Sequence, residues 1–280
     1  MINSLLKILI IFPALLAAVF VSRAQVVDDY LADEKYLYAA TKQVNQFFRR
    51  FNGEEDDRGN RFLPGDKRFR DADIRKGYLS MIFDNETPSF PNDLKRAFIR
   101  EVNNPSNPEY LDFHAPEWFA EVHATFRFNG RDENAILFLK LEKAGLGTKW
   151  VFDDAYFEPF ARMFNVDTAR NLAFLHPMSH EIDFMNLNKA FNNKEKVEDY
   201  AGQKYRPDYL SLVLYEIKRG NLQFKSVREV KFHFFQIKDW YFEISEFNRS
   251  GYNKGWLISN LARVEESQKE ALKNYIYLRN

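Results

Sequence analysis

Apolar residues in the first part of the chain recur with the period of a helix. In residues 33–51 they fall three or four positions apart, at Leu37, Ala40, Val44, Phe47 and Phe51. This spacing places them on one side of a helix, the side that packs against a core. The pattern predicts two further helices, at 73–83 and 91–105. The second of these has Asn92 as its expected N-cap.

From residue 119 the helical period gives way to strict alternation. Apolar side chains such as Val122 share one face of the predicted strand, and Glu121 and His123 share the other. Asn129–Gly130 is typical of a tight hairpin turn. The pattern therefore predicts three antiparallel strands, at 119–128, 135–143 and 149–157.

The second part of the chain repeats this order. Helices are predicted at 180–193 and 206–221, the latter with Asp208 as N-cap and Gly220 as its end. The apolar stripe of this helix consists of Leu210, Val213, Leu214 and Ile217. Strands follow at 224–237, 238–247 and 256–264, and a mostly polar helix at 265–278 closes the chain.

Two short stretches mark equivalent places in the two halves. "GLGTKWVF" at 145–152 and "GYNKGWLI" at 251–258 each lead from a glycine turn through a lysine to a tryptophan, Trp150 or Trp256. Helices followed by an antiparallel sheet indicate the α+β class. We therefore expect two tandem cone-like units, at 25–168 and 169–280, although "PSNPEYLDFHAPEW" at 105–118 has no counterpart in the second half.

An amphipathic first helix ending in "FFRRFNG", then further helices and long strands with a late tryptophan, resembles the nuclear transport factor 2-like superfamily. These are cone-shaped α+β domains whose sheet curls around the helices. The resemblance covers about 30–165 and 175–265. The superfamily contains enzymes, ligand binders and assembly modules, so the resemblance implies a fold and leaves the function open.

The first 24 residues have the layout of a secretory signal. A short basic start precedes the apolar run "ILIIFPALLAAVFV", and Ser22 and Ala24 are small residues suited to cleavage. The run of 14 residues is short for a membrane span, which needs about 20. We expect export to the periplasm or beyond the cell, with retention of residues 5–22 as an anchor as the alternative.

Charge and cysteine content exclude several classes of function. Lys plus Arg and Asp plus Glu number 40 each, so the chain has no global field to attract nucleic acid. It contains no cysteine, which excludes disulfides, cysteine nucleophiles and cysteine-ligated metals. Since no glycine-rich phosphate loop is present either, we predict neither a cofactor nor nucleic-acid binding.

The five histidines are the natural place to look for acid–base chemistry. His123 and His233 lie on the polar faces of their strands, so we expect both to point outward as surface residues. His176 and His180 have helical spacing for a metal, but Pro177 favours extended backbone between them. We therefore predict no metal site.

Asp112 and His114 are the first residues to consider for catalysis, because a carboxylate beside an imidazole can abstract a proton. They lie in a proline-rich loop without a recognisable third group, so we assign no catalytic residue. Four consecutive acids, 54–57, cannot all converge on calcium, and we expect them to form a solvated loop.

These observations favour an exported, non-enzymatic protein of the bacterial envelope that acts by contact with protein partners. Two alternatives stay open. One is a proton-transfer or hydrolytic enzyme with a small-molecule pocket in one cone. The other is a secreted carbohydrate or lipid binder that uses surplus aromatic residues.

Overall fold

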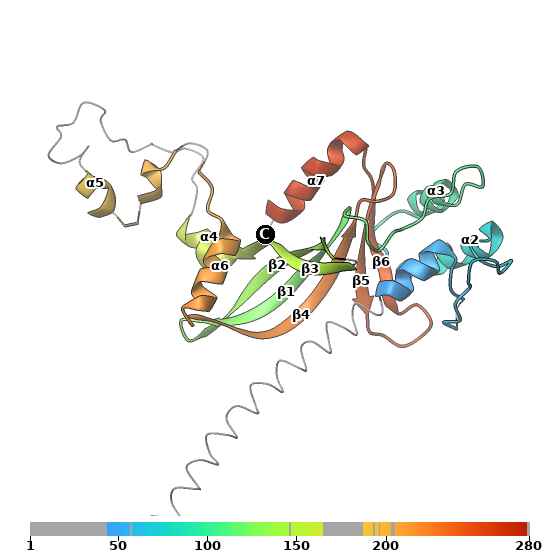
Figure 1. Cartoon of the computed structure of the whole chain (residues 1–280), viewed down its shortest axis with the longest axis horizontal. Helices are drawn as coiled ribbons and strands as arrows, with labels where there is room; N and C mark the ends of the chain where they lie inside the picture. Colours follow the sequence, from blue (N-terminus) through green and yellow to red (C-terminus); the bar gives the residue numbers. More distant parts are fainter. Residues whose placement is uncertain are drawn as a thin grey trace, which may run out of the picture. The chain divides into compact units, whose positions relative to one another are not determined.

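A computed structural model of the chain describes residues 44–56, 58–145, 147–164, 187–192, 194–195, 197–202 and 205–278 (Figure 1). The expected signal segment 1–24 lies outside these ranges. Among the described residues, none of the helices combines the length and apolar composition that a membrane crossing requires.

The described strands form one six-stranded sheet in the order β3-β2-β1-β4-β5-β6. The strands are β1 (Trp118–Phe128), β2 (Arg131–Ala144), β3 (Gly147–Phe157), β4 (Leu222–Phe234), β5 (Trp240–Phe247) and β6 (Gly255–Arg263). β1 is antiparallel to both β2 and β4, and the β2–β3 and β4–β5 pairs are also antiparallel. The α+β class predicted from the sequence is confirmed.

The helices lie before, between and after the strands. A helical segment at 44–52 comes first. The others are α2 (Ala72–Met81), α3 (Asn92–Val102), α4 (Glu158–Met163), α5 (Leu187–Asn192), the 3-10 helix η2 (Val197–Tyr200), α6 (Tyr209–Lys218) and α7 (Glu266–Leu278). Most of the predicted helix 180–193 falls outside the described residues, which include only α5.

Local signals placed several caps and turns correctly. The Asp208 carboxylate accepts a hydrogen bond from the Ser211 amide at 3.0 Å, which confirms it as the N-cap of α6. Gly220 after α6 and the Asn129–Gly130 turn adopt positive φ, as their sequence contexts predict. The expected cap at Asn92 is wrong: Pro91 is the N-cap of α3 and makes no side-chain bond.

The two predicted sets of three strands meet in a single sheet, because β1 pairs with β4 along almost its whole length. The chain nevertheless divides into two compact units, at other places than 168/169. Unit 1 comprises the described residues up to Phe113 together with Glu246–Ile258. Unit 2 comprises His114–Ser245 and the residues from Ser259 onward. Trp256 thus belongs to unit 1 and Trp150 to unit 2.

Unit 1 has an aromatic core between its helices. Phe51 and Phe98 are fully buried and their rings meet edge to face, with centroids 6.2 Å apart. Phe83 packs on Phe98 and forms a parallel bridge with Ile258. The later segment 246–258 is therefore joined to the first helices through the backbone.

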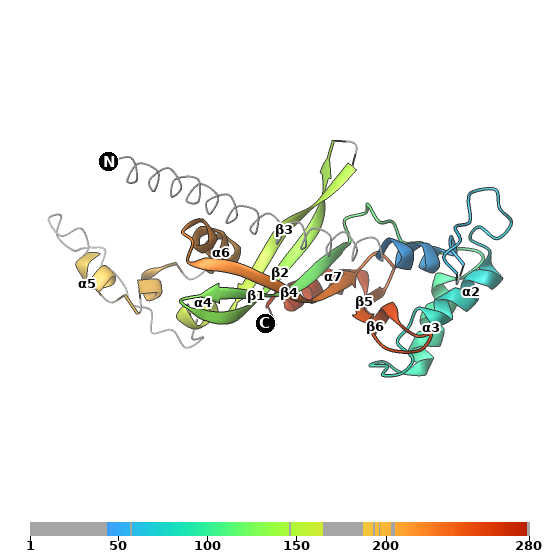
Figure 2. The same ribbon diagram turned by 90° about the horizontal axis from the view of Figure 1, so that it is seen from below.

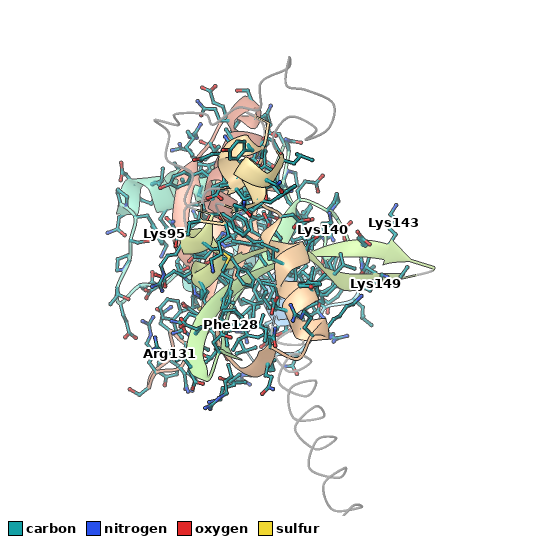
Figure 3. The ribbon with its side chains drawn as sticks, turned by 90° about the vertical axis from the view of Figure 1, so that its left-hand side faces the viewer. Lys95, Phe128, Arg131, Lys140, Lys143 and Lys149 are labelled. Carbon is teal, nitrogen blue, oxygen red and sulfur yellow. The ribbon has the colours of Figure 1, made fainter. Side chains whose placement is uncertain are left out.

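Unit 2 is built on a long curved sheet (Figure 2), and buried apolar residues lie on both of its faces. On one face Trp118 stacks on Phe234, with ring centroids 5.3 Å apart. On the other face α7 covers a cluster that includes Phe119, Phe138 and Tyr241. The β2–β3 hairpin projects from the sheet, with Lys143 and Lys149 at its tip, away from Phe128 and Arg131 at the β1–β2 turn (Figure 3).

Candidate functional site

A chain of polar side chains crosses the α7-covered face of the sheet in unit 2. The Tyr241 hydroxyl lies 2.8 Å from Nδ1 of His233, and Nε2 of His233 lies 2.9 Å from Oε2 of Glu121. The other oxygen of the same carboxylate, Oε1, lies 2.6 Å from Nε2 of His123. One carboxylate therefore bridges two imidazoles, and a tyrosine ends the chain. We call these four residues the polar network.

Strand alternation and pairing explain how the polar network forms. Glu121 and His123 are two apart on β1 and therefore share a face. His233 on β4 lies opposite Phe119, which is on that same face. The Phe119 ring stacks on the His233 imidazole with centroids 4.8 Å apart, which orients the imidazole toward Glu121.

The polar network is buried at one end and reaches the surface at the other. His233 is 0% exposed and Glu121 1% exposed, whereas 19% of the His123 side chain is accessible. The expectation that both histidines point outward is therefore wrong for His233. The alternation of polar residues predicts that this strand face is solvated. In the structure α7, predicted as a mostly polar helix, covers part of the face with Leu272, Ile276 and Tyr277.

Hydrogen positions in the polar network follow from its acceptors. Toward an ionised Glu121 carboxylate, which can only accept, Nε2 of each histidine is the donor. In the neutral form of His233, Nδ1 is then the acceptor for the Tyr241 hydroxyl. Within the described part of the chain, Nδ1 of His123 makes no hydrogen bond. His123 is thus an imidazole oriented by a carboxylate, the arrangement that general bases use.

Neighbouring charges lie on the same face of the sheet. Glu229 is opposite His123 and Lys231 is opposite Glu121, and these two side chains form an ion pair of 3.7 Å. On β3, burial raises the pKa of Asp154 above its ordinary value, and the negative charges of Asp153 and Asp208 raise it further. The face therefore gathers titratable groups, although no sequence motif marks it.

The residues considered first for catalysis fall in different units. Asp112 belongs to unit 1, where it lines a cavity, and His114 belongs to unit 2. Nδ1 of His114 lies 2.9 Å from the Thr148 hydroxyl on β3. No catalytic assignment follows for either residue.

His176 and His180 lie outside the described residues. Within the ranges that the structure describes, no three His, Asp or Glu side chains are grouped to hold a metal ion.

The acidic loop 54–57 is only partly solvated. Glu55 is 1% exposed and accepts hydrogen bonds of 2.6 Å from Gln46 and from Arg49. Glu54 accepts two bonds from Arg70. The expectation of a solvated loop is wrong for Glu55, because Gln46, Arg49 and Arg50 of the preceding helical segment bind its carboxylate.

A cavity of about 480 Å³ lies in unit 1, within the range of small-molecule sites. Its walls come from the helical segment 44–52, from Glu54 and Arg70, and from residues 110–113. Two arginines, two acids and three aromatic rings contribute to its lining.

An apolar band is exposed on unit 2. It consists of three side chains of α6: Leu214 (41% exposed), Tyr215 (53%) and Ile217 (42%). Leu214 and Ile217 belong to the apolar stripe predicted for α6, but only Val213 is fully buried when α6 packs on β3 and β4. The stripe is therefore wider than the surface that α6 covers.

Comparison of the chain with protein-family models, with curated proteins and with solved structures finds no match.

Proposed function

We propose that the chain is an exported, non-enzymatic protein of the cell envelope that binds a protein partner through the apolar band of unit 2. The observation that carries this proposal is the exposure of three large apolar side chains on α6. Grouped exposed apolar residues are typical of interaction surfaces, because water solvates them poorly. The signal-like residues 1–24 support export.

A photo-crosslinking amino acid placed at Leu214 or Ile217 tests the proposal in the native cell. We expect discrete crosslinks to a partner at both positions. The matched control is Lys143, an exposed residue at the hairpin tip of the same unit. Equal crosslinking at Lys143, or none at the band, contradicts the proposal.

A double variant, Leu214→Glu with Ile217→Lys, separates binding from folding. Both side chains are more than 40% exposed, so the free energy of unfolding should change by only about 0.5 kcal/mol. We expect the crosslinks or co-purification of the identified partner to be lost. N-terminal sequencing of the mature chain tests export, with Gln25 as the expected first residue.

An enzymatic function is the second candidate, and the oriented imidazole of His123 is the observation that favours it. A proton-transfer or hydrolytic reaction would use Nδ1 of His123 as the base, with Glu121 stabilising the imidazolium that forms. Turnover of ester, glycoside or peptide substrates by the purified chain, abolished by His123→Ala, would replace the binding function with this one. His114→Ala is the matched control.

The resemblance to the nuclear transport factor 2-like superfamily belongs to the same proposal. The order β3-β2-β1-β4-β5-β6 is symmetric about the β1–β4 pair, which supports descent of β1–β3 and β4–β6 from one ancestral unit. Such a duplicated scaffold is suited to assembly, since it presents broad sheet and helix surfaces.

A further inference from the structure

The cavity of unit 1 has walls that are fixed by hydrogen bonds and that need no ligand to form. The buried Asn52 amide donates to the Leu111 carbonyl at 2.9 Å and accepts from the Leu111 amide at 2.8 Å. This pair ties residues 110–113 to the helical segment 44–52. On the opposite wall, the Arg70 amide donates to the Gly53 carbonyl at 2.9 Å. A preformed site binds with little loss of conformational freedom.

Charges in the cavity lining are balanced. Arg49 and Arg70 contribute two positive charges, and Glu54 and Asp112 contribute two negative ones. Arg70 donates to Oε1 of Glu54 from Nε at 2.8 Å and from Nη2 at 2.6 Å, and Arg49 donates from Nε to Glu55 at 2.6 Å. A phosphate or a simple cation would therefore meet like charge as well as opposite charge, which disfavours ligands of a single sign.

Aromatic and planar polar groups both line the same cavity. Phe48 and Phe113 meet edge to face with centroids 5.3 Å apart, and Phe113 is partly exposed. Among the lining groups, the Asp112 carboxylate can accept two hydrogen bonds side by side, and the Asn45 amide can donate two. Adjacent hydroxyls of a sugar ring match such pairs, while the C–H face of the ring packs on an aromatic side chain. Neither feature suits an aliphatic ligand.

We propose that this cavity binds a neutral saccharide of one or two rings. The bound sugar offers hydroxyls to Asp112 and Asn45 and places its apolar face against Phe113. This site goes beyond the protein contact proposed for unit 2 and uses none of the residues of the apolar band.

Titration of the isotope-labelled full chain, followed by NMR, tests the proposal. The probes are glucose, N-acetylglucosamine, cellobiose and N,N′-diacetylchitobiose. At least one should cause saturable shifts of amide signals from residues 45–54 and 110–113. Sodium phosphate and glycine betaine are the charged and zwitterionic comparisons, and we expect no saturable shift from either.

Variants then assign the binding to the cavity. Asp112→Ala should lower the affinity for the saccharide at least tenfold. Asn45→Ala is a second cavity variant, used in case the first does not fold. Asp93→Ala, at the exposed start of α3, is the matched control and should leave the affinity unchanged. Three results would overturn the proposal. They are failure of all four sugars to bind, binding of phosphate or betaine at the same residues, and an affinity in both cavity variants equal to that of the unchanged chain.

Discussion

Both compact units bury a charged side chain, but they satisfy its hydrogen bonds in different ways. In unit 1 the guanidinium of Arg75, 1% exposed, donates mainly to backbone carbonyls. Nε reaches Phe51 at 2.8 Å, Nη1 reaches Val102 at 3.1 Å, and Nη2 reaches Glu109. In unit 2 the buried carboxylate of Glu121 instead accepts from two histidine side chains.

The difference has a physical consequence for each unit. Phe51 lies at the end of the helical segment 44–52 and Val102 ends α3, so Arg75 places its charge at two helix C-termini, where a cation is favoured. Burial lowers the pKa of Arg75 to about 10, which leaves it charged at neutral pH. The partners of Arg75 are fixed by the backbone, whereas the partners of Glu121 are side chains. Unit 1 thus holds its buried charge through its backbone fold, and unit 2 holds its own through a side-chain network.

The largest effect is expected for Arg75→Met. The substitution leaves three carbonyls without their buried donor and should destabilise unit 1 by about 4 kcal/mol in urea unfolding. Arg75→Lys should rescue little, since one ammonium cannot reproduce the fork of a guanidinium. Arg96→Met, on the exposed side of α3, should change stability by about 0.5 kcal/mol or less. A loss below about 1 kcal/mol in Arg75→Met would show that the carbonyls find other donors.

Glu121→Ala should destabilise unit 2 by about 3 kcal/mol, because His233 loses its acceptor while it stays buried. A double-mutant cycle with His233→Ala should give a coupling energy of about 1–3 kcal/mol. Glu229→Ala, on the same sheet face but 51% exposed at its side chain, is the matched control. Additive single effects in the cycle would mean that the polar network is not a unit.

Asp84 tests whether unit 1 also contains a pH-sensitive pair. Burial alone would raise the pKa of Asp84, but hydrogen bonds from Thr87 and Arg249 outweigh it and lower the pKa to about 2. The folded state therefore holds the ionised form, and the resulting stability is complete above the ordinary value of 3.8 and is lost as the pH falls toward 2.

The free energy of unfolding, measured between pH 5 and pH 2, should fall with the pH. Asp84→Asn should make this fall smaller by about 1–2 kcal/mol. Asp93→Asn, at the exposed start of α3, controls for a general effect of acid on the unit. An unchanged slope in Asp84→Asn would assign the acid sensitivity to other carboxylates.

The smallest effects should be equal in the two units. Asp71 caps α2 by accepting from the Ile74 amide at 2.9 Å, and Asp208 caps α6 through Ser211. Each change to alanine should remove about 1 kcal/mol of stability, measured by urea unfolding. A much larger loss at Asp208 would mean that α6, despite its exposed apolar band, is critical to unit 2.

The candidate sites were less visible in the sequence than the elements that carry them. Asp112, singled out beside His114, does line the cavity of unit 1, but six of the other lining residues lie 42–67 positions earlier in the chain. Strand alternation places Glu121 on a polar face but indicates no function for it, because its partner His233 lies 112 residues further along the chain. A polar residue in an alternating strand carries no local sign of being buried.

Periodicity and turn chemistry by themselves determined where the strands and the longer described helices lie, since the side-chain direction in both depends only on near neighbours in the chain. They did not predict the short helices α4 and η2. They placed all six strands, the cap at Asp208 and the turn at Asn129–Gly130. Only the tertiary structure decided that β1 pairs with β4, that His233 is buried beside Glu121 and Phe119, and that Arg75 reaches three distant carbonyls. These outcomes depend on contacts between residues far apart in the chain, where many pairings satisfy the same alternation and packing selects one.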